Sequence, residues 1–371
     1  MNLSKVTSMT VLAMCVATGA KAGVEIQAGK SKVTVGAGVR TSFTSNDNGV
    51  SKTDGVTVKR TNNIEIDRSD LKIDIQANQK LKFSFALEPH AFQRDGGAGR
   101  AVEAAYFTYS PISMLNIMAG IQTLNLGGVE NVYDAIDVYH YSNWYKSYGF
   151  GSQVMDYAPA IAPQVVVGPL AFTLQLADRS ASDVSSTAAK GTTDVDPILI
   201  TSRVDVKLPV GSGSITPTLT YAAITNQQKQ LTAGVMIQMA GLTADVGYNR
   251  AMYAKNDKLA GNPSTDSDGK AIASNVSSIE LMAKYDLAMG EMTLSPWLKY
   301  ANLTNDMKVA GTEPKALETY NSEIFLGAAL TIDAMTAGLS YAIQSGDYFK
   351  ASGSEETRSN GTLGLHFGAK I

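Results

Sequence analysis

The feature that most constrains this chain is a two-residue alternation of apolar and polar side chains that recurs along its length. In residues 32–44, Val33 and Val35 fall on one face of a strand, and Thr34 and Arg40 fall on the other. Such a strand has one face suited to lipid and one suited to water. Beyond residue 22 no apolar run approaches the roughly 20 residues of a spanning helix. A membrane protein of this kind must be a closed β-barrel, because strands satisfy their backbone groups only between one another.

Sixteen segments of the sequence show this pattern or a close variant of it. Ile64 and Ile66 have the opposite parity to Leu71, which predicts a bulge or a later strand start near residues 67–69. The predicted strands are 32–44, 71–76, 81–88, 101–109, 115–122, 153–168, 171–177, 198–208, 214–223, 231–239, 242–253, 278–287, 292–303, 323–332, 335–344 and 362–371.

The connections between these segments alternate in length, which a soluble β-sandwich has no reason to do. Short periplasmic turns and longer outer loops are typical of bacterial outer-membrane barrels, and an even strand number places both ends in the periplasm. We therefore predict an all-β fold, a transmembrane antiparallel β-barrel. The short turns are predicted at 78, 111–113, 168–170, 209–213, 240–241, 288–291 and 333–334.

The amino terminus has the pattern of a secretory signal peptide. Lys5 precedes an apolar stretch over 6–17, and Ala20-Lys21-Ala22 forms a small-x-small cleavage site. We expect residues 1–22 to be removed, which leaves 23–371 as a single barrel domain. The only cysteine lies in the removed segment, so disulfides are not expected. Loss of two lysines changes the formal net charge from −3 to −5, which gives no sign of nucleic-acid binding.

Several segments resemble one family. They are 66–88, 102–111, 117–128 and the last strand. In the last strand, apolar residues spaced by two end at Ile371, and this pattern resembles the terminal strands that the barrel-assembly machinery recognises. In these segments and in its overall pattern the chain resembles the Gram-negative porins, which are trimeric, sixteen-stranded diffusion channels. The resemblance implies an outer-membrane homotrimer in contact with the lipid bilayer and lipopolysaccharide, passing small hydrophilic solutes without a cofactor.

The longest connection, residues 123–152, follows the fifth predicted strand, where porins carry a loop that folds inward. In the family, acids on this loop face basic residues on the opposite wall. The alternative is that each charged candidate in this chain is an ordinary solvated charge of the lumen or of a loop. Together with the net charge, the loop acids predict a modest preference for cations. The acidic candidates are Glu130, Asp134 and Asp137, and the basic candidates are Arg40, Arg68, Lys72 and Lys82.

Tyrosines occur near many predicted strand ends, where they are expected to form the aromatic girdles of a membrane barrel. The tyrosines within 139–148 can either pack the long loop or provide a track for sugars. The girdle candidates are Tyr106, Tyr221, Tyr248, Tyr285, Tyr300 and Tyr341.

Catalysis is not expected. His140 and Asp137 could form a general base, but no serine nucleophile or set of metal ligands accompanies them. Three functions remain: a general porin, a channel selective for a sugar, carboxylate or phosphate, and a structural or adhesive barrel. Few, dispersed arginines argue against a phosphate channel, and moderate loops argue against an adhesin. The sequence therefore favours a general porin.

Overall fold

The computed structural model describes residues 24–28, 31–47, 60–87, 102–123, 157–178, 198–224, 228–253, 272–309, 317–349 and 355–370. Regular structure in these ranges consists of β-strands. None of the described ranges holds a helix long and apolar enough to cross a membrane. The predicted signal peptide and the long-loop candidates, Glu130, Asp134, Asp137 and the tyrosines of 139–148, lie outside the described residues.

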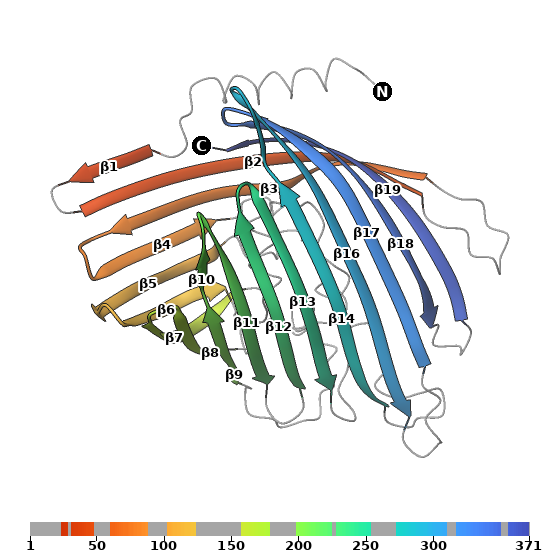
Figure 1. The fold of residues 1–371 in the computed structure, drawn as a ribbon, viewed down its shortest axis with the longest axis horizontal. Helices are drawn as coiled ribbons and strands as arrows, with labels where there is room; N and C mark the ends of the chain where they lie inside the picture. The colour runs from red at the N-terminus through yellow and green to blue at the C-terminus, as the bar shows by residue number, and fades with distance from the viewer. Residues whose placement is uncertain are drawn as a thin grey trace.

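In the described part of the chain, the strands follow one another without other elements (Figure 1). The first nine are β1 (Val24–Ala28), β2 (Ser31–Asp47), β3 (Arg60–Gln76), β4 (Leu81–Leu87), β5 (Val102–Ile112), β6 (Leu115–Thr123), β7 (Tyr157–Val167), β8 (Leu170–Asp178) and β9 (Ile198–Val206). The others are β10 (Leu208–Val210), β11 (Gly213–Ile224), β12 (Gln228–Met239), β13 (Leu242–Tyr253), β14 (Ile272–Tyr285), β15 (Leu287–Met289), β16 (Met292–Val309), β17 (Leu317–Ile332), β18 (Met335–Phe349) and β19 (Glu355–Lys370).

These strands form one closed antiparallel ring. Neighbouring strands pair in order along the chain, and β19 pairs with β2 to complete the ring. Two positions in the ring are broken strands, because β9 and β10 both pair with β11, and β14 and β15 both pair with β16. β1 shares one position in the ring with β19, because both pair with β2. The ring therefore has sixteen strand positions. The predicted sixteen-stranded barrel is confirmed.

The first and last strands share one edge of β2. β19 pairs with residues 38–47 of β2, and β1 pairs with residues 31–35. β1 therefore continues the position of β19 beyond Lys370, as the red strand beside the start of β2 in Figure 1 shows. The barrel wall at this point is completed by residues from both ends of the chain.

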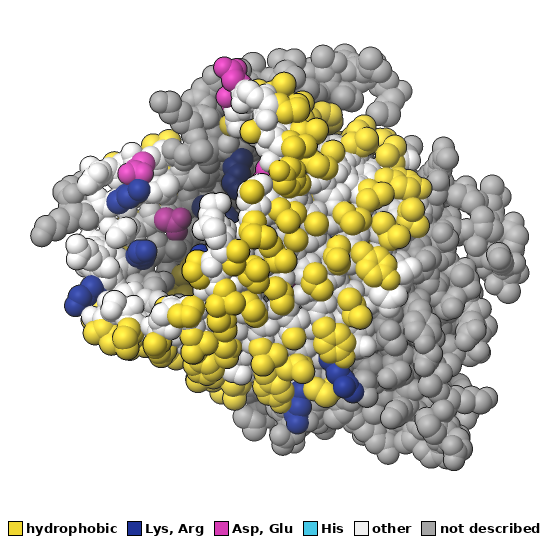
Figure 2. All heavy atoms as spheres, in the orientation of Figure 1, with side chains coloured by type: hydrophobic (Ala, Val, Ile, Leu, Met, Phe, Trp, Pro, Cys, Tyr) yellow, Lys and Arg dark blue, Asp and Glu magenta, His cyan; other side chains and the backbone are white. Residues whose placement is uncertain are grey.

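The barrel has apolar side chains outside and polar side chains inside, the reverse of a soluble protein. Phe83, Leu326 and Leu339 occupy apolar positions of the alternating pattern, and they are 43%, 49% and 52% exposed. Their chain neighbours on the other face include Phe325 and Ser340, which are buried. Figure 2 shows many yellow apolar side chains spread over the middle of the outer surface. This surface is the one that a bilayer covers in a membrane barrel.

A bulge restores the alternation in β3. Arg40 of β2 lies opposite Arg68, but the next residue, Thr41, lies opposite Ile66, which leaves Asp67 outside the register. The extra residue brings Ile64, which is exposed, onto the outward face. The predicted irregularity at 67–69 is confirmed as a bulge.

The short turns lie at one end of the barrel. In the β12–β13 hairpin, Ala240 and Gly241 both have positive φ, at 44° and 86°, as the tightest hairpin turns require. Two predicted turns were displaced, because Pro111 and Pro209 lie within strands. The register shifts between Tyr109 and Ile112, and such an irregularity can accommodate a proline that has no N–H to donate.

Candidate functional site

The lumen face carries the candidate site, and its first part is a basic wall made by Arg40, Lys72 and Lys82 on β2, β3 and β4. Lys72 alternates with the outward residues of β3, and Lys82 alternates with those of β4. Both lysine side chains are exposed, so they reach the water of the lumen. Asp74 lies between them on the same face and accepts a hydrogen bond of 2.7 Å from Ser84 Oγ. The wall therefore has an excess of positive charge.

Arg40 stands at the junction where the ring closes. It is half-buried, and its backbone lies opposite Arg68 on one side and Gly368 on the other. The backbone of Arg68 is described, but its side chain is not. Three of the four predicted basic candidates are thus placed on adjoining strands of one wall. Their role in a constriction stays a prediction, since the loop acids lie outside the described residues.

An acidic wall lies on β13, β14 and β17, formed by Asp245, Glu280 and Glu323. All three side chains face the lumen and are at most 3% exposed. Ala301 of β16 lies opposite Glu280 on one side and opposite Glu323 on the other. Lys299 is two residues from Ala301 on the same face, so it lies diagonally between the two glutamates and within reach of both. Lys299 thus lies between two of the three carboxylates.

Further contacts hold this wall in place. Ser278 Oγ donates a hydrogen bond of 3.3 Å to Glu280 Oε1, and Asn249 Nδ2 donates one of 3.2 Å to Ser278 Oγ. Lys299 Nζ lies 4.7 Å from the ring centroid of Phe325, its partner across β16 and β17. A cation over an aromatic face is attracted by the ring quadrupole, so this contact helps to hold the Lys299 side chain in place.

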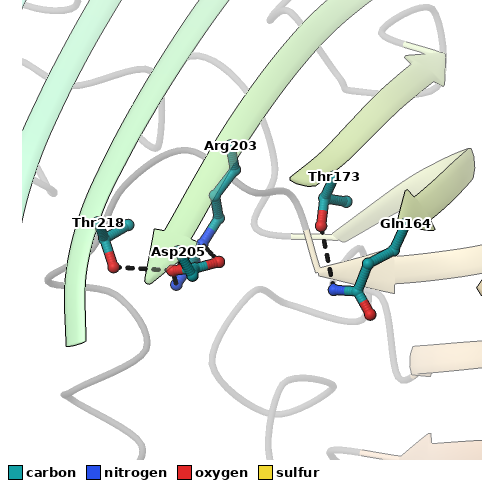
Figure 3. A network of polar contacts seen from close by, with 5 residues as sticks. All are labelled: Gln164, Thr173, Arg203, Asp205 and Thr218. Atoms are coloured by element: carbon teal, nitrogen blue, oxygen red, sulfur yellow. Dashed lines mark hydrogen bonds and ion pairs between the residues drawn. The ribbon is translucent and has the colours of Figure 1, made fainter. Parts of the chain in front are cut away.

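Between these walls, a charge-paired network lies on β9 and β11 (Figure 3). Asp205 accepts hydrogen bonds from Arg203, with Nε to Oδ2 and Nη2 to Oδ1 both at 2.8 Å. Thr218 Oγ1 donates a third bond of 2.7 Å to Oδ1. Two parallel bonds between a guanidinium and a carboxylate give a strong and directional ion pair. Arg203 therefore faces the lumen with its charge balanced by Asp205.

A ladder of neutral polar groups continues from this network across β8, β7, β6 and β5. Gln164 Nε2 donates to Thr173 Oγ1 at 3.1 Å (Figure 3), and Asn116 Nδ2 donates to Gln164 Oε1 at 3.1 Å. Ser110 Oγ then donates to Asn116 Oδ1 at 2.7 Å. Each step crosses from one strand to the next, so this part of the lumen is polar but carries no net charge in these four side chains.

The tyrosines divide between the two faces. Tyr221, Tyr248, Tyr285 and Tyr341 are exposed on the outward face, where the girdle prediction requires them. Tyr106 was placed wrongly by that prediction: it lies opposite Ser84 and Gly120 on the lumen face. The physical reason is that its neighbours Ala105 and Phe107 occupy the outward positions of β5, so alternation turns Tyr106 inward.

Sequence reasoning did not single out the acidic wall or Lys299. The signal was present, because Asp245, Glu280 and Lys299 each lie at a polar position within an alternating predicted strand. The long loop received the attention instead, through its resemblance to porins. The described residues contain no group of three histidine, cysteine or acidic side chains placed to hold a metal ion.

One serine–histidine contact occurs in the barrel wall. Ser340 Oγ and His366 Nε2 lie 2.8 Å apart between β18 and β19. Both side chains are only 1% exposed, so a substrate could not reach the serine without movement of the wall. The contact joins the last two strands and adds no reactive group to the lumen surface.

Comparison with known proteins agrees with this architecture. No protein-family model matches the sequence, and no curated protein matches it. Among solved structures, the outer-membrane channel DcaP of Acinetobacter baumannii has a TM-score of 0.63 and 15% identity, covering 94% of this chain and all of that one. An anion-selective porin from Comamonas acidovorans has a TM-score of 0.60 and 14% identity, covering 92% of this chain and all of that one.

A third similar structure is the outer-membrane OmpT of Vibrio cholerae. Its TM-score is 0.60 at 10% identity, and the match covers 94% of this chain and all of that one. Identities this low show a shared fold and leave residue roles open. The resemblance to porins is confirmed at the level of the fold.

Proposed function

We propose that this protein is an outer-membrane porin through which small hydrophilic solutes and ions diffuse passively. The observation that carries the proposal is the closed ring with apolar residues outside and charged residues inside. Such a surface is stable in a bilayer only if the interior is wet. The full-length match to outer-membrane channels and porins supports the same role.

The two walls suggest how such a pore discriminates. Lys72 and Lys82 provide positive charge from one side, and Asp245, Glu280 and Glu323 provide negative charge from the other. Fixed charges of opposite sign order the water between them, so a polar solute passes more easily than an apolar one of equal size. Glu130, Asp134 and Asp137 would strengthen this field if the long loop folds inward, as the resemblance implies.

Assembly as a homotrimer is part of the proposal. One similar structure, at 11% identity and a TM-score of 0.58, is described as a trimer form of Vibrio cholerae OmpT. Lipid and lipopolysaccharide would then contact the outward surface that remains outside the subunit interfaces. Crosslinking after mild detergent extraction should give a heat-sensitive species of three subunits. Recovery of the monomer alone after crosslinking would contradict this.

Planar-bilayer recording of the refolded full-length protein tests the pore. We expect discrete conductance steps that rise in proportion to salt concentration, as for a wide aqueous passage. The rate of proteoliposome swelling should fall steadily as the size of the probe sugar increases from a pentose to a trisaccharide. Absence of conductance from a correctly folded barrel would refute the porin proposal, and saturable block by one solute class would replace it with a selective channel.

A further inference from the structure

The barrel wall between β7 and β8 contains an interruption in its strand pairing. Ile161 lies opposite Leu176, and Gln164 lies opposite Thr173, but within these described strands the residues between them form no pair. The register is the same on both sides, so the interruption is not a bulge with an extra residue. We call the unpaired residues the seam gap; they are 162–163 of β7 and 174–175 of β8.

Prolines explain why the pairing stops here. Val166 N of β7 donates a hydrogen bond of 2.9 Å to Met114 O beside β6. Even-numbered residues of β7 therefore bond to β6, and odd-numbered residues bond to β8. Pro163 is odd-numbered and has no N–H, so the carbonyl of Leu174 opposite it loses the donor that the ladder would supply. Pro159 removes another donor on the same side of β7.

Side chains hold the seam gap together from the lumen. Gln175 Nε2 donates a hydrogen bond of 2.9 Å to the carbonyl of Thr123 at the end of β6, so this side chain crosses the lumen face of β7. Thr201 Oγ1 of β9 donates to Gln175 Oε1 at 3.4 Å. Gln122 Nε2 donates to the carbonyl of Ala160 at 2.9 Å. Single bonds from flexible amides thus join four strands at a place where backbone bonds are missing.

Both faces of the wall are apolar at the seam gap. On the lipid side, Ile161 and Leu176 are 56% and 43% exposed. On the lumen side, Ala162 of the gap is fully buried, and small apolar residues of β7, β8, β9 and β11 form a buried cluster beside it. An apolar path therefore leads through the wall. The cluster consists of Ala158, Ala160, Ala177, Leu199 and Ala222.

Two similar interruptions elsewhere in the wall differ on the lumen side. They lie opposite Pro217 of β11 and Pro296 of β16. The first is bordered by Asp205 and its ion pair. At the second, Lys284 Nζ lies 3.3 Å from Asp286 Oδ1, which also accepts a hydrogen bond from a neighbouring serine. An apolar molecule would have to displace charged groups at both places.

We propose that the seam gap opens laterally and lets a small, uncharged, mainly apolar molecule pass from the lumen into the bilayer. Opening an intact ladder inside a membrane is costly, because it exposes backbone groups that lipid cannot satisfy. At the seam gap the Leu174 carbonyl already lacks its ladder donor, so opening exposes fewer new groups. The molecule gains free energy by leaving water for lipid. The proposal rests on the proposed pore, since the gap is reached through the lumen.

The experiment measures uptake of the apolar fluorophore phenylnaphthylamine into vesicles that carry the refolded full-length protein and lipopolysaccharide in the outer leaflet. Pro163→Val restores an N–H toward Leu174 and should slow protein-dependent uptake about fivefold, as expected for one added hydrogen bond. Gln175→Ala removes the bond to Thr123 and should accelerate uptake by a similar factor. Pro296→Val is the matched control and should leave uptake unchanged.

A disulfide gives a second test within one folded sample. Ala162→Cys with Gln175→Cys places two thiols at a non-hydrogen-bonded position of the β7–β8 register, where Cα atoms approach to about 4.5 Å and a disulfide can form. Oxidation should abolish protein-dependent uptake, and reduction should restore it.

Vesicle swelling by a pentose, measured on the parent and on Pro163→Val, separates this route from the pore. It should be equal in the two proteins, because Pro163 lies on the outward face. The lateral route is overturned if Pro163→Val takes up the fluorophore as fast as the parent, if Pro296→Val slows uptake as much, or if the oxidised and reduced forms behave alike. Absence of pentose swelling in the folded parent would instead refute the pore, and with it the path to the gap.

Discussion

Trp297 and Gly327 face each other across β16 and β17 on the lumen side, so closely that a Cβ atom at Gly327 would overlap the indole ring. The indole is 7% exposed and occupies the space that any other side chain at 327 would need. Glycine is required here by close packing, and the backbone of Gly327 has no unusual φ. The size of the side chain at position 297 therefore limits which residue position 327 can hold.

We predict that Gly327→Ala destabilises the barrel, because overpacking a fixed ring typically costs about 1–3 kcal/mol. The measurement is the midpoint of thermal unfolding followed by heat-modifiable gel mobility. Gly234→Ala is the matched control, since a Cβ there would meet its nearest neighbour at an ordinary 3.4 Å. In a Trp297→Ala background the Gly327→Ala change should cost much less. An equal loss in Gly327→Ala and Gly234→Ala would disprove the packing argument.

A second prediction concerns the register of β4. Lys82→Cys should react with a membrane-impermeant thiol reagent in lipid vesicles, and Phe83→Cys should not, because the two residues face opposite sides of the wall. The only native cysteine, Cys15, lies within the predicted signal peptide, so the parent protein without that segment should give no thiol labelling. Labelling at 83 without labelling at 82 would mean that the strand is turned over.

A third prediction tests the ion pair of Arg203. Asp205→Asn removes the charge that accepts two bonds from the guanidinium of this part-buried cation. We expect a loss of about 1–2 kcal/mol in the free energy of unfolding, since hydrogen bonds to charged groups are among the stronger ones. Thr218→Val, which removes only one bond to the same carboxylate, should cost less. Equal stability of parent and Asp205→Asn would show that the pair contributes nothing.

The fourth prediction concerns the basic wall. Lys72→Glu with Lys82→Glu reverses two charges that are exposed to the lumen, so cations should be enriched in the passage, most strongly at low salt where screening is weak. The zero-current potential across a salt gradient should shift toward cation preference. Lys207→Glu lies outside the strands that form this wall and serves as the control. If it shifts the potential as far as the double variant does, the wall does not control selectivity.

The fifth prediction concerns the long loop. Replacing Glu130, Asp134 and Asp137 by the corresponding amides should move the zero-current potential toward anions and leave assembly intact. The parent pore should prefer cations modestly, because the lysines of the basic wall offset part of the acidic charge. An unchanged potential in the triple variant would mean that the loop does not line the narrow part of the pore.

Much of the fold could be predicted because lipid contact imposes a simple rule on strand residues. The rule located the bulge near Asp67 as a change of parity, and the hairpin at Asn78 as a polar interruption between two alternating segments. It failed at the ends of the long strands: β3 begins at Arg60 and β16 continues to Val309, where polar residues follow one another in the sequence. Alternation carries no information there, because polar residues occupy consecutive positions.

The site was less predictable for a related reason. Parity identifies which residues face the lumen, but it does not rank them. Lys299 and Glu280 lie at ordinary polar positions, and only the register of β14 and β16 shows that they are diagonal neighbours. Tyr106 was misassigned because a tyrosine near a strand end was given more weight than the parity of β5. Strand register is a long-range property, and a single sequence constrains it weakly.

The pairing of β19 with β2 has a consequence for biogenesis. His366 meets Ser42 across this seam, so the ring closes through contacts more than 300 residues apart in the chain. Closing so long a loop costs chain entropy before the contact contributes any stabilising free energy. The seam is therefore a late and slow step of insertion. Until it forms, β2 and β19 both present unpaired backbone edges, which in a bilayer are especially costly and elsewhere invite aggregation. A chain released before its final strand is synthesised would therefore be a target for periplasmic proteolysis, however well its other hairpins had formed.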